Sequence, residues 1–211
     1  MEAGSKPSLA EERELDRIRA FSDGVFAVAI TLLVLNIEVP DVAAGDLAGA
    51  LDDLIPDVQA YFIAFAVIGL FWFGHHRSWS RYRGTTAGLV WANLLLLSLI
   101  ALMPFTTALM GRYDDEAISV VLYACNVGLA SLADSFVDKV AFDQGLAEPV
   151  DAREHRAEVV TGWLRPAIFI LSIPLAFVSV LLAQLLWLTL LLLPWVGRRV
   201  ARPGSTTDRS P

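Results

Sequence analysis

The chain has 211 residues, of which 55% are hydrophobic and only 18% charged, and its formal net charge is −7. Soluble domains carry nearer a quarter charged residues, and the charges here gather between long apolar stretches, so the sequence predicts a membrane protein. No Lys/Arg-rich block of the kind that binds nucleic acid is present, and the single cysteine, Cys125, excludes an intramolecular disulfide and argues against a thiolate metal site.

The polar and mostly acidic start, MEAGSKPSLAEEREL, lacks the basic and apolar regions of a cleavable signal peptide. We therefore expect residues 1–16 to form a short N-terminal segment and the first transmembrane helix to be retained. At the other end, RPGSTTDRSP has the composition of a disordered tail, which we assign to residues 201–211.

Apolar runs predict six transmembrane helices in the intervening residues 17–200. Four are separate runs, at 18–39, 58–74, 87–110 and 117–137. We expect Pro40 to end the first helix and Pro104 to break the third near its end. The last run, 162–195, would be about 50 Å long as one helix against a bilayer core of about 30 Å, so it is predicted to form two helices with a turn at 179–184.

The distribution of positive charge predicts the orientation. With six spans both termini lie on the same side, and if that side is the cytoplasm, all 16 Lys and Arg residues except Arg112 fall in cytoplasmic segments. The two longer outer loops are acidic instead. Because lysine and arginine favour the cytoplasmic side, we expect both termini to be cytoplasmic.

The first span carries an aliphatic stripe along one face. At 100° per residue, four side chains fall within about 60° of Val28 and a fifth, one turn further on, joins them: Gly24, Thr31, Leu32, Leu35 and Val39. Asp23 points roughly 140° away from Val28, so the acid and the stripe face different surroundings. Spacing alone fits ordinary helix packing or lipid contact as well as a functional surface.

Asp23 is costly inside a membrane, by about 2.5–3.5 kcal/mol on insertion scales, and should have a partner. One interpretation is that Ser22 or Asp23 caps the start of the first helix. The other is a buried polar network. The sequence by itself does not separate the two.

Further polar residues are expected at the same depth in the second and third spans. His75 and His76 project about 100° apart, so they are not a chelating pair, and with only His155 elsewhere no metal site is predicted. One of the two histidines should face the bundle, where it could bond to a carboxylate or a serine. Asn93 is expected to form a hydrogen bond that helps to hold neighbouring helices together.

These residues carry a resemblance to a known family. Arg17, Phe21, Ser22 and Asp23, in the pattern Arg-x-x-x-Phe-Ser-Asp followed by GVFAVAITLLVL, resemble the first helix of the lysosomal potassium channel family (transmembrane-protein-175 type) in its bacterial six-helix form. The similarity continues through FWFGHHR and WANLLLLSLIALMPFTTAL, and it covers the first three helices. The last three match only in length and hydropathy.

The resemblance implies an all-α integral membrane protein that forms a homotetramer, with the first helices around a central pore. It implies stacked hydrophobic rings of Val28, Leu32 and Leu35 with a hydroxyl ring of Thr31 nearby. It further implies a structural network in each subunit, formed by Arg17, Phe21, Ser22, Asp23, His75 or His76, and Asn93. Two positions depart from the family pattern: Val28 is smaller than the usual isoleucine or leucine, and Arg19 stands where an acid is common.

The implied function is a potassium-permeable cation channel of the inner (plasma) membrane, without enzymatic activity or a cofactor. The sequence has no TVGYG-like segment for a carbonyl filter, so we expect a hydrophobic gate and weak selectivity for K⁺ over Na⁺, with possible passage of H⁺. The expected partners are other copies of the chain, membrane lipid and the permeating ion. A secondary or proton-linked cation transporter is the alternative, although no charged residue lies at mid-bilayer beside Pro104 or Pro174.

Overall fold

The computed structural model describes residues 9–43, 45–148 and 152–192. Over these residues the protein is entirely helical, apart from one isolated bridge between Tyr82 and Ala147. The α-helices and two 3₁₀ turns, in chain order, are α1 (Leu9–Leu32), η1 (Leu33–Asn36), α2 (Leu47–Asp52), α3 (Ile55–Trp79), α4 (Ala87–Arg112), α5 (Ala117–Asp143), α6 (Ala152–Ala176), α7 (Val180–Trp187) and η2 (Leu188–Leu192).

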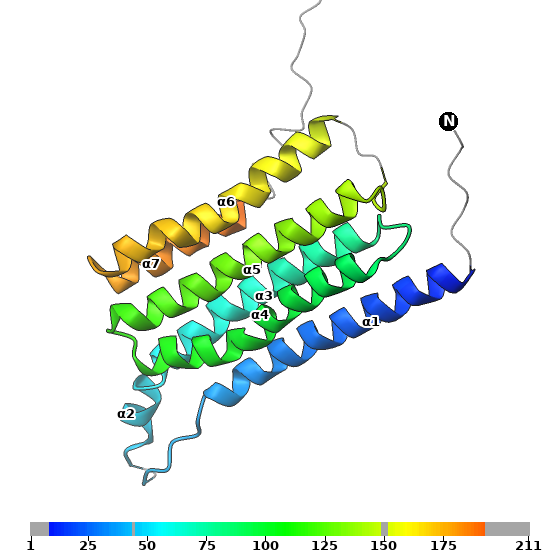
Figure 1. Ribbon diagram of the computed structural model, residues 1–211. Helices are drawn as coiled ribbons and strands as arrows, with labels where there is room; N and C mark the ends of the chain where they lie inside the picture. The colour runs from blue at the N-terminus through cyan, green and yellow to red at the C-terminus, as the bar shows by residue number, and fades with distance from the viewer. Residues whose placement is uncertain (1–8, 44, 149–151, 193–211) are drawn as a thin grey trace, which may run out of the picture.

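The long helices run up and down as an antiparallel bundle (Figure 1). Helix α4 packs on α1, α3 and α5, and α5 packs in turn on α6. About half of the apolar windows of α4 and α5 are buried, at 50% and 56%, against 22% for α1. Helix α1 therefore lies at an edge of the bundle and leaves most of its surface open.

Four helical segments are long and apolar enough to cross a membrane, at Leu9–Asn36, Leu47–Trp79, Ala87–Arg112 and Ala117–Asp143. Two shorter apolar helices follow at Gly162–Ala176 and Val180–Leu190. The prediction of an all-helical membrane protein is confirmed at this level. The tail at 201–211 lies outside the described residues.

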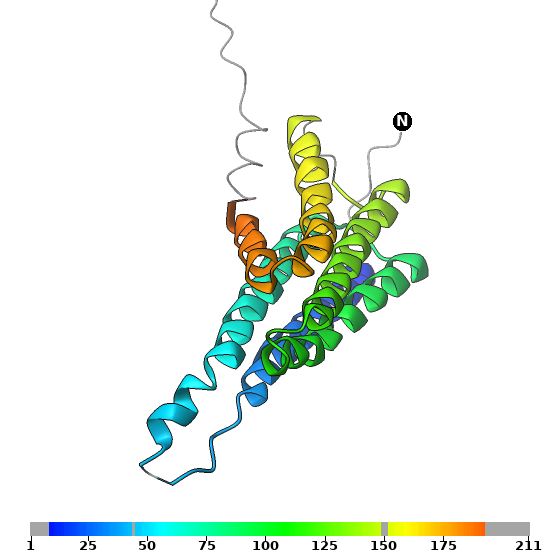
Figure 2. The ribbon, with the colours of Figure 1, turned by 90° about the vertical axis from the view of Figure 1, so that its left-hand side faces the viewer.

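The sequence of α1 explains how it docks. The buried residues of α1 and of the η1 turn that continues it recur at intervals of three, four and seven, which places them on a single face of a helix: Leu15, Ser22, Phe26, Ala29 and Leu33. This face packs against α3 and α4. The segment that follows η1, including α2, projects beyond the end of the bundle before the chain returns in α3 (Figure 2).

Two expectations about the helix ends are wrong. Pro104 is buried inside α4 without ending it, as membrane helices tolerate proline. The carbonyl of Pro104 itself accepts from Asn36 Nδ2 at 2.9 Å. Helical structure after α1 ends at Asn36, so Val39 lies in the linker and not on the stripe. The expected division of the last apolar run into two helices is found, with a turn at 177–179 that overlaps the expected 179–184 at Ser179, which caps α7 by accepting from the Leu182 amide.

Candidate functional site

The face of α1 opposite its buried residues is exposed and apolar. Val28, Leu32 and Leu35 are 57%, 41% and 71% exposed. Thr31 and Gly24 are exposed on the same side. The stripe predicted from the sequence is therefore a continuous surface that no other part of the described chain covers.

Leu35 belongs to this surface although it lies in the 3₁₀ turn η1. A 3₁₀ turn advances about 120° per residue instead of 100°, which rotates Leu35 by roughly 60° from its α-helical position and aligns it with Leu32. Leu35 lies on the same face under either winding, and the tighter winding brings it into line with Leu32.

Thr31 is the one hydroxyl within the apolar part of the face. Its Oγ1 donates to the carbonyls of Ala27 and Val28, at 3.0 and 2.9 Å. The proton is thereby engaged within the helix, and lone-pair capacity of the oxygen remains on the exposed side. The face presents a single polar atom of acceptor character between hydrophobic side chains.

Behind the face, a chain of buried hydrogen bonds joins α1 to α4 and α3. Ser22 Oγ donates to the Ile18 carbonyl at 2.9 Å and accepts from Asn93 Nδ2 at 3.0 Å. The Asn93 Oδ1 atom lies 2.9 Å from His75 Nε2. Because that amide oxygen only accepts, the proton of neutral His75 is assigned to Nε2. His75 is therefore the histidine that faces the bundle, and its ring stacks on Trp79.

Asp23 lies outside this chain of bonds. Its Oδ1 accepts from Trp72 Nε1 at 2.9 Å, and the Trp72 ring stacks on His76. Helix α1 begins at least thirteen residues before Ser22, so the N-cap interpretation of Ser22 and Asp23 is wrong. The acid forms a separate contact between α1 and α3.

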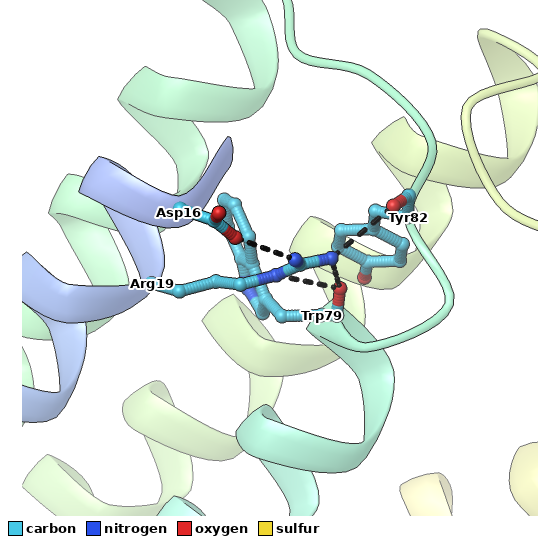
Figure 3. Close-up of polar contacts among 4 residues, drawn as sticks. All are labelled: Asp16, Arg19, Trp79 and Tyr82. Carbon is cyan, nitrogen blue, oxygen red and sulfur yellow. Dashed lines mark hydrogen bonds and ion pairs between the residues drawn. The ribbon is translucent and has the colours of Figure 1, made fainter. Parts of the chain in front are cut away.

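The two remaining motif residues are not brought into these contacts within one chain. Arg17 and Phe21 are exposed, two turns and one turn before Gly24 respectively, on the same side of α1 as the apolar face. Arg19 instead reaches α3: its Nε and Nη2 donate to the Trp79 carbonyl at 3.2 and 2.6 Å, and Nη2 also donates to the Tyr82 carbonyl at 3.3 Å (Figure 3).

Sequence reasoning did not include Trp72, Trp79 and Tyr82 among the partners of α1. The two tryptophans suited a membrane interface equally well, which hid their specific bonds. For Arg19, one sequence feature could have indicated its partner. Arg19 lies near the N-terminal end of the first span, at the same depth as the C-terminal end of the second span, and a helix C-terminus offers free carbonyls to a cation.

A hollow of about 190 Å³ lies between α1 and α3 at this end of the bundle, lined by Arg19, Asp23, His75, His76, Trp79 and Ser80. It has room for a few water molecules. Within the described residues no group of three or more His, Cys, Asp or Glu side chains comes close enough to hold a metal ion. The hollow thus exposes the Asp23 contact to solvent without forming a metal centre.

Fold and site together define a multi-pass helical membrane protein whose peripheral first helix keeps an apolar face open. The model of the family described as "Endosomal/lysosomal potassium channel TMEM175" matches residues 17–104. A potassium channel of Streptomyces collinus is 36% identical over 173 residues, 79% of this chain and 84% of that protein. One of Chamaesiphon minutus is 34% identical over 183 residues, 82% and 89% of the two chains.

The fold agrees with a solved structure as well. The crystal structure of a lysosomal potassium-selective channel TMEM175 homolog from Chamaesiphon minutus aligns with a TM-score of 0.75 and 31% identity, over 89% of this chain and 98% of that one. The chain belongs to the TMEM175 family, a family of ion channels and not of enzymes. The resemblance seen in the sequence is confirmed.

Proposed function

We propose that the protein is a potassium-permeable cation channel, in which four copies place the exposed faces of their α1 helices around a central path. The observation that carries the proposal is the uncovered α1 face with Val28, Thr31, Leu32 and Leu35. In a single chain an apolar surface of this kind needs a partner or lipid. The relatives named potassium channels support K⁺ as the permeating ion.

The topology that we propose has six membrane-crossing helices in residues 17–200 and both termini in the cytoplasm, in the cell's inner membrane. Support comes from the positive-inside distribution together with the fold. The N-terminus of α1 lies at the same end of the bundle as the linkers that follow α3 and α5 (Figure 1). The linker that follows α3 carries the arginines Arg81 and Arg83.

The gate that we propose consists of stacked rings of Val28, Leu32 and Leu35, spaced about 6 Å apart along the helix. A narrow aliphatic ring expels water and stops ions, because it offers no replacement for their hydration. Ions would then cross largely hydrated when the helices separate, and the Thr31 oxygens would contact the hydration water. The looser shell of K⁺ gives it a modest advantage over Na⁺.

The polar contacts behind the face are assigned a structural role. Ser22, Asn93 and His75 hold α1 to α4 and α3 from the side away from the path, and Asp23 binds Trp72 with His76 stacked beyond. Arg17 and Phe21 continue the exposed side of α1 toward the N-terminal end. We assign these two to contacts between neighbouring subunits at the cytoplasmic mouth.

The proposal is tested by K⁺ flux from liposomes that contain the reconstituted protein. Leu35→Asn, which makes polar the ring farthest from the cytoplasmic mouth, should increase flux severalfold, since a wetted ring no longer excludes ions. Leu171→Asn is the matched control, because Leu171 is as exposed as the gate residues but lies on α6. No flux from the wild type would refute the channel, and equal effects of both variants would remove Leu35 from the gate. Flux that saturates and follows a proton gradient would favour a transporter.

A further inference from the structure

Arg19 fastens the N-terminal end of α1 to the last turn of α3. The carbonyls of a helix C-terminus lack partners within the helix and carry partial negative charge, so a guanidinium is well suited to them. Arg19 donates to the Trp79 and Tyr82 carbonyls, and Asp16, one turn back on α1, orients the same guanidinium at 3.2 Å (Figure 3). The contact lies between the apolar face of α1 and the rest of the bundle.

Tyr82 accepts this contact through its carbonyl and is itself bonded to α5 through its side chain. Its ring is buried against Trp79, with centroids 5.2 Å apart. Its hydroxyl donates to Asp138 Oδ1 of α5 at 2.6 Å. Burial, and then the charge of Asp138, raise the pKa of that hydroxyl, so it remains a donor at physiological pH.

The backbone around Tyr82 is joined to the α5–α6 linker as well. The Arg83 amide donates to the Leu146 carbonyl at 2.8 Å, and the Glu148 amide donates to the Arg81 carbonyl at 3.1 Å. Gly145 makes this possible: at φ +67° it ends α5, and the Leu146 amide turns back to the Ala141 carbonyl at 2.9 Å. The linker therefore reaches the end of α3 in a fixed register.

One turn of α5 before Asp138, a second polar contact extends the connection to α6. Asp134 Oδ2 accepts from Arg165 Nη1 at 3.1 Å, and the side chain of Asp134 is only 14% exposed. The guanidinium of Arg165 also lies against Gly74 of α3, where an added Cβ would stand 3.5 Å from it. Polar contacts therefore join α1, α3, α5 and α6 at one end of the bundle.

From these contacts we infer that Tyr82 is a joint through which the α5–α6 half of the subunit sets the position of the pore helix, with Arg19 as the positioning residue on α1. This inference rests on the proposed channel function. Arg19 holds α1 back against its own bundle and away from the path. When the joint is loosened, the N-terminal ends of four α1 helices approach one another and the open state is disfavoured.

The test uses single-channel recording of the full-length protein in planar bilayers. Tyr82→Phe keeps the ring and the carbonyl but removes the hydrogen bond to Asp138. Arg19→Gln removes the guanidinium that donates to the Trp79 and Tyr82 carbonyls. Each should lower the open probability about threefold to tenfold, the scale of one or two hydrogen bonds, at unchanged unitary current. The double variant should do no more than the stronger single one, and Arg19→Lys should restore most of the wild-type value. Arg83→Gln, which breaks only the exposed side-chain pair with Glu148 of the α5–α6 linker and keeps the backbone bonds between the two linkers, should change nothing.

Amide hydrogen exchange separates this inference from the channel proposal, because it does not need conduction. In Tyr82→Phe, residues 15–24 of α1 should exchange several times faster, although the lost hydroxyl touches only α5. Unchanged exchange in α1 would overturn the joint even if the protein conducts, and faster exchange would support it even if no current is seen. The inference would also be overturned if the reductions in open probability caused by Tyr82→Phe and Arg19→Gln multiplied in the double variant. A reduction in open probability by Arg83→Gln as large as that by Tyr82→Phe would overturn it as well.

Discussion

Asn93 is the central link between α1 and the bundle, and its replacement by leucine should be the most damaging single change in the buried network. Leucine has the same number and branching of side-chain heavy atoms, so the change mainly removes two hydrogen bonds, of 3.0 Å to Ser22 and 2.9 Å to His75. Ser22 keeps its bond to the Ile18 carbonyl, whereas the proton on His75 Nε2 is left buried without an acceptor.

The magnitude follows from these losses. A hydrogen bond between membrane helices contributes about 0.6 kcal/mol on average, and an orphaned buried donor costs about 1–3 kcal/mol. We therefore expect Asn93→Leu to cost about 2–4 kcal/mol. Ser22→Ala leaves the Asn93 Nδ2 donor without its acceptor but keeps Asn93 paired with His75, so it should cost about 1–3 kcal/mol, less than Asn93→Leu. The double variant should cost little more than Asn93→Leu alone, because the two residues share a bond.

The assay is unfolding in mixed micelles with increasing SDS, followed by tryptophan fluorescence. The control is Ser98→Ala on the same helix, because Ser98 is exposed and its hydroxyl bonds only to the Leu95 carbonyl one turn away. If Asn93→Leu lowers the free energy of unfolding no more than Ser98→Ala does, the buried network is refuted. A larger loss for Ser22→Ala than for Asn93→Leu would refute the central place of the amide.

Two further predictions concern helix packing. Gly111→Ala should destabilise the fold by about 1–3 kcal/mol, because its Cβ would stand 3.1 Å from the Cα of Asp57 on α3. Gly69→Ala, which meets nothing within 4 Å, should be neutral or stabilising in the same unfolding assay, and equal losses would contradict the close approach. Arg165→Ala should cost about 3 kcal/mol by leaving Asp134 unpaired, and Asp134→Asn in the same chain should recover part of it. Lys139→Ala, which breaks an exposed pair with Asp143, should have almost no effect on the unfolding midpoint.

The membrane helices and the open face of α1 could be predicted from the sequence because both depend on local periodicity. Hydrophobic runs fix where helices form, and 100° per residue fixes which side chains share a face. The position of Leu35 shows the limit of this reasoning: the sequence placed it on the face, but not the 3₁₀ winding that aligns it with Leu32.

The partners of polar residues depend on how helices are brought together, and periodicity does not contain that information. Arg19 and its acceptor at Trp79 are 60 residues apart, and Asn36 and Pro104 are 68 apart. Asp23 was assigned to a cap or a buried network, yet it bonds to a tryptophan in a solvent-accessible hollow. Pro104 was expected to break α4 near its end, yet the helix continues to Arg112.

The central claim is that the exposed face of α1 lines the ion path, and modification by a charged thiol reagent during single-channel recording tests it most directly. The native Cys125 is exposed on α5, away from that face, so the reagent should leave wild-type current unchanged. In Leu32→Cys the reagent should abolish the K⁺ current, because one charged adduct per subunit would stand in a narrow path. Wild-type current that is blocked, or Leu32→Cys current that persists after complete modification, would contradict the account.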